Sequence, residues 1–136
     1  MSLLAGKLGV RTMEKYPLRD LWLNPKRVFT VRGVRVVLDS DLAKVYGVPT
    51  KRLNEQVRRK PGRFPSDFAF LLSSREWEEI RAQIAAAGHE RLPYRRYLPY
   101  AFTELGAVMA AGLLRSPRAI EASIYIARAS ALWVDD

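Results

Sequence analysis

Five side chains within residues 51–59 have the types and the spacing to contact duplex DNA. An arginine can donate two hydrogen bonds to guanine O6 and N7, and an asparagine can pair in the same way with adenine N6 and N7. Lysine and further arginines suit contacts with backbone phosphates. This chemistry requires that the side chains share the outer surface of one element. The residues concerned are Lys51, Arg52, Asn54, Arg58 and Arg59.

A helix through this segment would provide such a surface. Leu53 and Val57 are four residues apart and share one side of a helix, which is the predicted buried side. At about 100° per residue, Lys51 and Arg58 fall on the opposite side. Glu55 is expected to order the neighbouring cations through exposed ion pairs. The helix is therefore predicted to present a cationic surface to solvent.

The residues before this helix predict a second short helix, joined to it by a tight turn. Asp39 is a good N-cap, and the first helix is expected to run to Tyr46. Gly47 is expected to end it because glycine adopts left-handed dihedral angles at little cost. Thr50 is expected to cap the basic helix. Two helices in this arrangement are typical of a helix-turn-helix, whose second helix enters the major groove.

A β-branched, apolar stretch over residues 28–38 predicts a β-hairpin in front of the helix pair, with Gly33 in the turn. Arg32 and Arg35 then lie at or beside the tip, where they are expected to contact the phosphate backbone as a wing does. Residues 28–63 contain nine Lys and Arg against three Asp and Glu. This quarter of the chain therefore carries +6 of the net charge of +9.

The segment after the basic helix predicts a strand and another helix. Pro61 and Gly62 are expected to end the basic helix, and residues 68–72 fit a short buried strand. Ser73 and Glu76 form a capping box that begins a helix. The predicted buried face of that helix consists of Trp77, Ile80 and Ile84.

The C-terminal third predicts two more helices, so the expected fold class is α+β: a small hairpin, a helix-turn-helix-like pair and further packed helices. Thr103 is expected to cap the first of these helices, and Ser116 with Pro117 the second. The apolar side of the first is predicted to consist of Val108, Met109 and Leu113. The apolar stripe of the second consists of Ile120, Ile124, Ala127 and Ala131.

A second basic patch, Arg91, Arg95 and Arg96, precedes an aromatic stretch that contains Tyr97 and Tyr100. Alternation of basic and aromatic residues can serve the stacking of nucleic-acid bases. The aromatic stretch is apolar enough to belong to the core. The two tyrosines are therefore expected to be buried, with the arginines on the rim.

Composition excludes several classes of function. The 136 residues, 49% of them hydrophobic, suit one domain, and a net charge of +9 favours a polyanionic partner. The absence of cysteine excludes disulfides, zinc fingers and thiol nucleophiles, and it fits a cytoplasmic location. His89 is the only histidine, so no metal, cofactor or enzyme activity is expected. No apolar run approaches the roughly 20 residues of a membrane span.

The chain is expected to be organised as one domain with short flanking segments. Residues 1–27 lack a regular period and contain Pro17 and Pro25, which predicts an N-terminal arm or a tag-derived segment. Residues 28–133 are expected to form the domain, and residues 134–136 a tail.

Three ordered motifs resemble a known family. They are RGVRVVLDSDLAKVYGVPTKRLNEQVRR, RFPSDFAFLL and RRYLPYAFTELG. Over roughly residues 28–133 the chain is similar to the ORF-six-N-terminal domain, of the KilA-N and Bro-N group of phage, prophage and large DNA virus proteins. The resemblance implies a compact α+β DNA-binding domain of a phage-type regulator. The family's third motif usually reads FTEQG, whereas this chain has Leu105.

Two functions follow as hypotheses. The first is a DNA-binding domain of a prophage-type regulator, with double-stranded DNA as the partner. The second is an antirepressor-like module that binds a regulatory protein, or forms a homodimer through the apolar final helix that ends at Leu132 and Trp133. The first hypothesis predicts that DNA contacts come from Lys51, Arg52, Asn54, Arg58, Arg59, Arg32 and Arg35.

Overall fold

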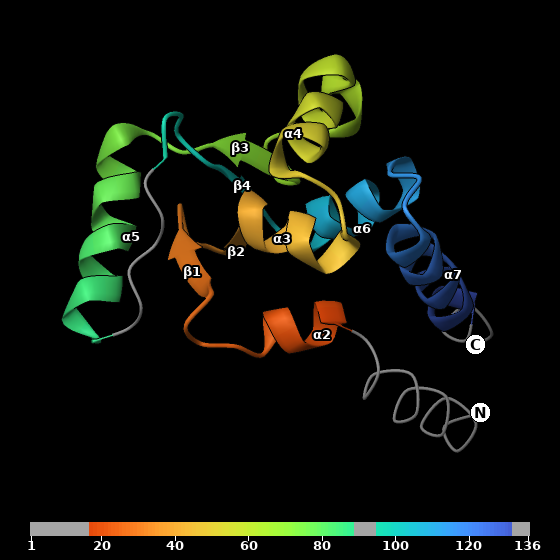
Figure 1. Cartoon of the computed structure of the whole chain (residues 1–136), viewed down its shortest axis with the longest axis horizontal. Coiled ribbons are helices and arrows are strands. Elements are labelled where there is room, and N and C mark those ends of the chain that lie inside the picture. The colour runs from red at the N-terminus through yellow and green to blue at the C-terminus, as the bar shows by residue number, and fades with distance from the viewer. Residues whose placement is uncertain (1–16, 89–94, 132–136) are drawn as a thin grey trace.

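A computed structural model describes residues 17–88 and 95–131, in which a four-stranded antiparallel sheet has helices on both faces (Figure 1). This confirms the expected α+β class. The strands are β1 (Val28–Val31), β2 (Val34–Leu38), β3 (Ala69–Leu71) and β4 (Tyr100–Phe102), in the spatial order β1-β2-β4-β3. The helices are α2 (Pro17–Trp22), α3 (Asp39–Tyr46), α4 (Thr50–Arg59), α5 (Ser74–Ala86), α6 (Glu104–Leu113), α7 (Pro117–Ala131) and a 3-10 turn, η1 (Pro61–Arg63).

The sheet separates two hydrophobic clusters because successive strand residues point to opposite faces. Val36 and Leu38 belong to the cluster that α5 covers, whereas Val37 and Phe102 belong to the cluster that the other helices cover. Figure 1 shows α5 standing on one side of the sheet, away from the remaining helices. The predicted buried face of α5 is confirmed, since it consists of Trp77, Ile80 and Ile84.

The predicted hairpin and the helix pair are both present. β1 pairs with β2 from Val28↔Val37 to Val31↔Val34. The two turn residues, Arg32 and Gly33, both have positive φ, at 54° and 78°. Such turns match the right-handed twist of the strands. α3 ends at Tyr46, and the φ of 66° at Gly47 confirms the left-handed cap.

Two of the predicted caps were wrong by one residue. Leu38 and Pro49 occupy the N-cap positions of α3 and α4, and neither gives a side-chain cap. Asp39 and Thr50 are instead the first helical residues. The Asp39 carboxylate is directed to tertiary partners described below, which is a use that a local pattern does not reveal.

The aromatic stretch before Thr103 contains a strand that was not predicted. β4 lies between β2 and β3, and its Ala101 is the register partner of both Leu38 and Phe70. The strand is only three residues long. It is stabilised by pairing with distant segments, so its own sequence carries little period-2 signal.

The helices α6 and α7 begin as predicted but bury different faces. Thr103 accepts a hydrogen bond from the Gly106 N–H, and Ser116 accepts one from the Ala119 N–H. The buried face of α6 consists of Gly106, Ala107, Ala110 and Ala111, while Val108 is exposed and Met109 and Leu113 are partly buried. On α7 the buried residues are Ala119 and Ala122, whereas Ile120 and Ile124 are about half exposed. Small residues therefore line the contact between α6 and α7.

Part of the predicted N-terminal arm is helical and packed. Leu18 and Leu21 of α2 are buried in the cluster that also contains α3. Several expectations lie outside the described residues. They concern the arm up to residue 16, His89, Arg91, Leu132, Trp133 and the tail 134–136.

Candidate nucleic-acid interface

α4 buries one side and exposes a basic one, as its spacing predicts. Leu53 and Val57 are buried in the main cluster. In Figure 1, α3 lies between α4 and α2, and α4 occupies the outer position. Four cationic side chains of α4 are exposed: Lys51, Arg52, Arg58 and Arg59. The amide side chain of Asn54 is half-buried.

The polar surface of α4 is divided into two stripes. Lys51, Asn54 and Arg58 follow the spacing of three and four residues that places side chains on one line along a helix, and all three line a groove. Arg52 and Arg59 lie on the adjacent stripe. Nη2 of Arg59 lies 3.9 Å from Oε2 of Glu55, which is the exposed ion pair expected on this helix.

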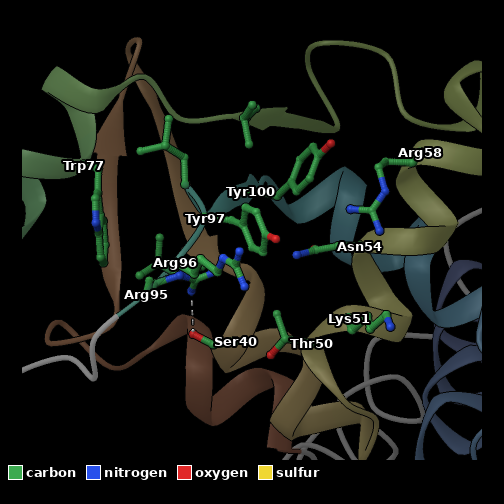
Figure 2. A pocket seen from close by; sticks show the side chains of 13 residues that line it. Ser40, Thr50, Lys51, Asn54, Arg58, Trp77, Arg95, Arg96, Tyr97 and Tyr100 are labelled. Atoms are coloured by element: carbon green, nitrogen blue, oxygen red, sulfur yellow. Dashed lines mark hydrogen bonds between the residues drawn. The ribbon is translucent and has the colours of Figure 1, made fainter.

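The groove runs between α4 and residues 95–100 and has a volume of about 1100 Å³. Figure 2 shows Asn54 and Arg58 on one side, facing Arg96 and Tyr97 on the other. The remaining lining is mainly apolar or aromatic and includes Leu38, Leu71, Trp77, Leu98 and Tyr100. No Asp or Glu is among the lining residues that the structure describes.

A buried carboxylate connects the two walls of the groove. Asp39 is fully buried, and its oxygens accept hydrogen bonds from Asn54 Nδ2 at 2.8 Å and from the Tyr100 N–H at 3.1 Å. Arg95 binds the same carboxylate through two nitrogens, at 2.8 and 3.0 Å. A buried charge is tolerated only when it is paired and hydrogen-bonded. The pairing therefore holds Asn54 and Arg95 in defined positions.

The hairpin arginines lie outside the groove lining and have partners elsewhere. Arg32 makes a two-pronged ion pair with Glu76 of α5, at 2.9 and 3.0 Å, and its guanidinium lies 4.1 Å from the centre of the Phe70 ring. Arg35 donates to the Trp22 carbonyl at 2.8 Å. These contacts tie the hairpin to α5 and α2. The predicted phosphate contacts of both arginines stay a prediction.

Glu76 receives hydrogen bonds from two directions. Donation from Arg32, and then from the Ser73 backbone N–H, lowers the pKa of Glu76 from 4.5 to about 2. The Ser73 hydroxyl in turn accepts from the Glu76 N–H, which confirms the predicted capping box. The same carboxylate therefore caps α5 and anchors the hairpin turn.

The expectation that Tyr97 is a core residue was wrong. Its side chain is 73% exposed at the groove, and the Arg96 guanidinium lies 5.5 Å from the centre of its ring. Tyr100 is partly buried against the main cluster. In the sequence, the alternation of basic and aromatic residues was the pattern that could have identified this wall of the groove. The apolar character of the stretch instead reflects β4, which begins three residues later.

Within the described part of the chain, no group of three His, Cys, Asp or Glu side chains is placed to hold a metal ion. None of the described helices is both long enough and apolar enough to cross a membrane.

Comparison with known families gives a match to most of the chain. A model of the ORF6N domain matches residues 26–113. This span contains the hairpin, α3, α4 and all of the residues that line the groove. No curated protein and no solved structure matches the chain.

Proposed function

Because the chain belongs to the ORF6N domain family, which is a phage-type family, we propose that it is the DNA-binding domain of a prophage-type regulator. In this proposal double-stranded DNA is the partner and α4 is the recognition helix. The proposed function is binding rather than catalysis. It would act on transcription through occupancy of a DNA site.

The exposed basic surface of α4 is the observation that carries the proposal. Lys51, Arg52, Arg58 and Arg59 are all exposed on a helix of 10 residues, which is about 15 Å long. With its side chains an α-helix is about 10–12 Å in diameter, so it fits the major groove, which is about 12 Å wide. Leu53 and Val57 attach the opposite side of α4 to the core. The cations can therefore approach DNA without exposing the core.

The hairpin is proposed as a second contact, to the phosphate backbone. A guanidinium carries five N–H donors, so Arg32 retains donors after it has bound Glu76. Arg35 likewise uses one nitrogen for the Trp22 carbonyl. Contacts of this kind would orient α4 without reading the DNA sequence.

The test of the proposal compares two charge-matched double variants. The full chain is titrated with a fluorescent duplex over a series of salt concentrations. Arg52→Ala with Arg58→Ala is expected to weaken binding at least about tenfold, because two charged contacts of about 1 kcal/mol each are lost. The slope of log affinity against log salt should also become shallower.

The control removes the same charge from the other side of the sheet. Arg75 and Arg81 are exposed on α5 and form ion pairs with Glu79 and Glu78. Arg75→Ala with Arg81→Ala should weaken binding far less than the α4 variant. If the α4 variant keeps the parent's affinity while circular dichroism shows an intact fold, then α4 is not the recognition helix.

An antirepressor-like interaction module is the second candidate, and the surface of α7 supports it. Ile120 and Ile124 are 49% and 47% exposed, and they lie four residues apart on one side of the helix. Exposed apolar stripes suit protein contacts. Light scattering that finds a dimer, together with its dissociation by Ile124→Ser, would support this candidate.

A further inference from the structure

The groove beside α4 has a chemistry that a contact with intact duplex would not use. We propose that it binds unpaired nucleotides of a DNA strand, with a base stacked on Tyr97 and phosphates held by Lys51, Arg58 and Arg96. The inference rests on the proposed function, because it deepens DNA binding at the same face of α4. It concerns the stripe of α4 that lines the groove. Lys51 and Arg58 on this stripe are shared with the proposed duplex contact, whereas Arg52 and Arg59 on the adjacent stripe would contact duplex alone.

Tyr97 is the first observation behind this inference. Its ring is 73% exposed even though the Arg96 guanidinium lies 5.5 Å from the ring centre. Bases inside a duplex already stack on one another, so an unpaired base offers its face to a protein ring without the cost of unstacking a base step. Exposed aromatic rings in a cationic groove are typical of proteins that bind single strands.

The charge of the groove is the second observation. Lys51, Arg58 and Arg96 line it, and none of the three forms an ion pair within residues 17–88 and 95–131. Other arginines, such as Arg32 and Arg59, have carboxylate partners. Since no acidic residue lines the groove in the described structure, the uncompensated charge favours a phosphate-bearing ligand.

The buried network that joins the two walls of the groove is the third observation. Asp39 holds Asn54 on the α4 wall and Arg95 on the opposite wall. Arg95 also lies 5.9 Å from the centre of the Trp77 ring. A groove whose walls are joined before binding loses less conformational freedom when a ligand enters. The spacing of the two walls is thus set by a buried network and not by the ligand.

The experiment uses the full chain and three probes of related sequence. They are a perfect duplex, the same duplex with a short unpaired bulge, and the single strand, with 2-aminopurine at the unpaired position. The bulged duplex is expected to bind about fivefold tighter or more than the perfect duplex, which corresponds to one stacked base. Binding should also change the 2-aminopurine fluorescence, because stacking quenches it.

Two variants at one position identify the ring as the cause. Tyr97→Ala should abolish both the preference for the bulge and the fluorescence change, while its affinity for the perfect duplex stays that of the parent. Tyr97→Phe keeps the aromatic face and should retain both effects. Equal affinity for bulged and perfect duplex, or a preference that survives Tyr97→Ala, would overturn the inference.

The outcomes separate this inference from the proposed function. If the perfect duplex binds through Arg52 and Arg58 and the bulge gives no gain, the proposed function stands and the groove assignment fails. If only the single strand binds, and does so in a Tyr97-dependent way, the groove assignment stands and duplex recognition fails. Binding to none of the three probes would overturn both.

Discussion

Asp39 and Glu76 are carboxylates that the local sequence assigns to helix starts, yet both also make long-range contacts. Asp39 accepts hydrogen bonds from residues of α4, of β4 and of the segment before β4. Glu76 caps α5 and also binds Arg32 in the hairpin turn. In each case one residue joins elements that are far apart in the chain. The effect of substituting either residue should therefore exceed that of losing a cap.

Glu76→Gln tests this at the residue scale through the dependence of stability on pH. The pKa of Glu76 is about 2 in the folded chain, below its ordinary 4.5. Its carboxylate therefore stabilises the fold fully above about pH 4.5, and this contribution is lost as the pH falls toward 2. The variant should be less stable than the parent at neutral pH and should lose less stability across that window. Denaturant unfolding at several pH values measures both.

Glu79→Gln is the matched control for this prediction. Glu79 lies on the same helix and pairs with Arg75 at 3.3 Å, but both side chains are largely exposed. Exposed pairs contribute roughly 0–1 kcal/mol, so this variant should unfold like the parent. If the two variants have the same pH profile, the Arg32–Glu76 pair makes no special contribution.

At the scale of elements, the packing of α6 against the start of β3 decides which residues the FTELG motif requires. Thr103 donates to the Asp67 carbonyl while it caps the helix. Gly106 lies so close to Phe68 that a Cβ atom would stand 1.8 Å from the Phe68 oxygen. Leu105, where the family usually has glutamine, is 53% exposed. The departure from the family motif therefore falls at a surface position.

Gly106→Ala is expected to destabilise the domain by about 3 kcal/mol or more, because the added methyl group overlaps backbone atoms that cannot move independently. Gly112→Ala is the control on the same helix, since a Cβ there meets nothing within 4 Å. Alanine has the higher helix propensity, so this variant should be neutral or up to about 1 kcal/mol more stable. Chemical denaturation of both variants measures the difference. Similar stabilities would show that α6 can move away from β3.

At the scale of the whole molecule, the basic surface is spread over three elements that one ligand would have to bridge. α4 supplies one group of cations, residues 95–96 supply a second, and the hairpin supplies a third. Arg32 and Arg35 join the hairpin to α5 and to α2, so their orientation depends on both faces of the sheet. The proposed wing contact is thus a property of the assembled fold.

Replacing Arg32 and Arg35 by alanine is expected to weaken binding to specific and random duplexes about equally, because phosphate contacts carry no sequence information. The log–log salt slope should fall by roughly one to two. Since Arg32 also binds Glu76, Glu76→Gln serves as the control that loses the pair and keeps the Arg32 charge. Titrations are made at a temperature at which both variants are folded. Salt slopes identical to the parent's would leave the hairpin with a packing role only.

The sequence alone determined the elements whose signals lie within a few residues. Local structure is specified by the positive φ angles that the turns require at Gly33 and Gly47, by the Ser73–Glu76 capping box and by the spacing of Leu53 and Val57. These signals depend on backbone sterics and on helix or strand period, which a short segment carries in itself. They were sufficient to predict the hairpin, the helix pair and the cationic side of α4.

Tertiary structure alone decided β4, the partners of Asp39 and the groove. The Asp39 carboxylate and the Tyr100 N–H that it accepts from are 61 residues apart in the chain. Tyr97 is predicted to be buried because its stretch is apolar, but it is exposed, and the buried Ala101 and Phe102 of the stretch belong to β4, which follows it. Contacts of this kind arise only when distant segments pair and pack. No local period or propensity encodes which segments those are, so the groove could not be derived from the sequence.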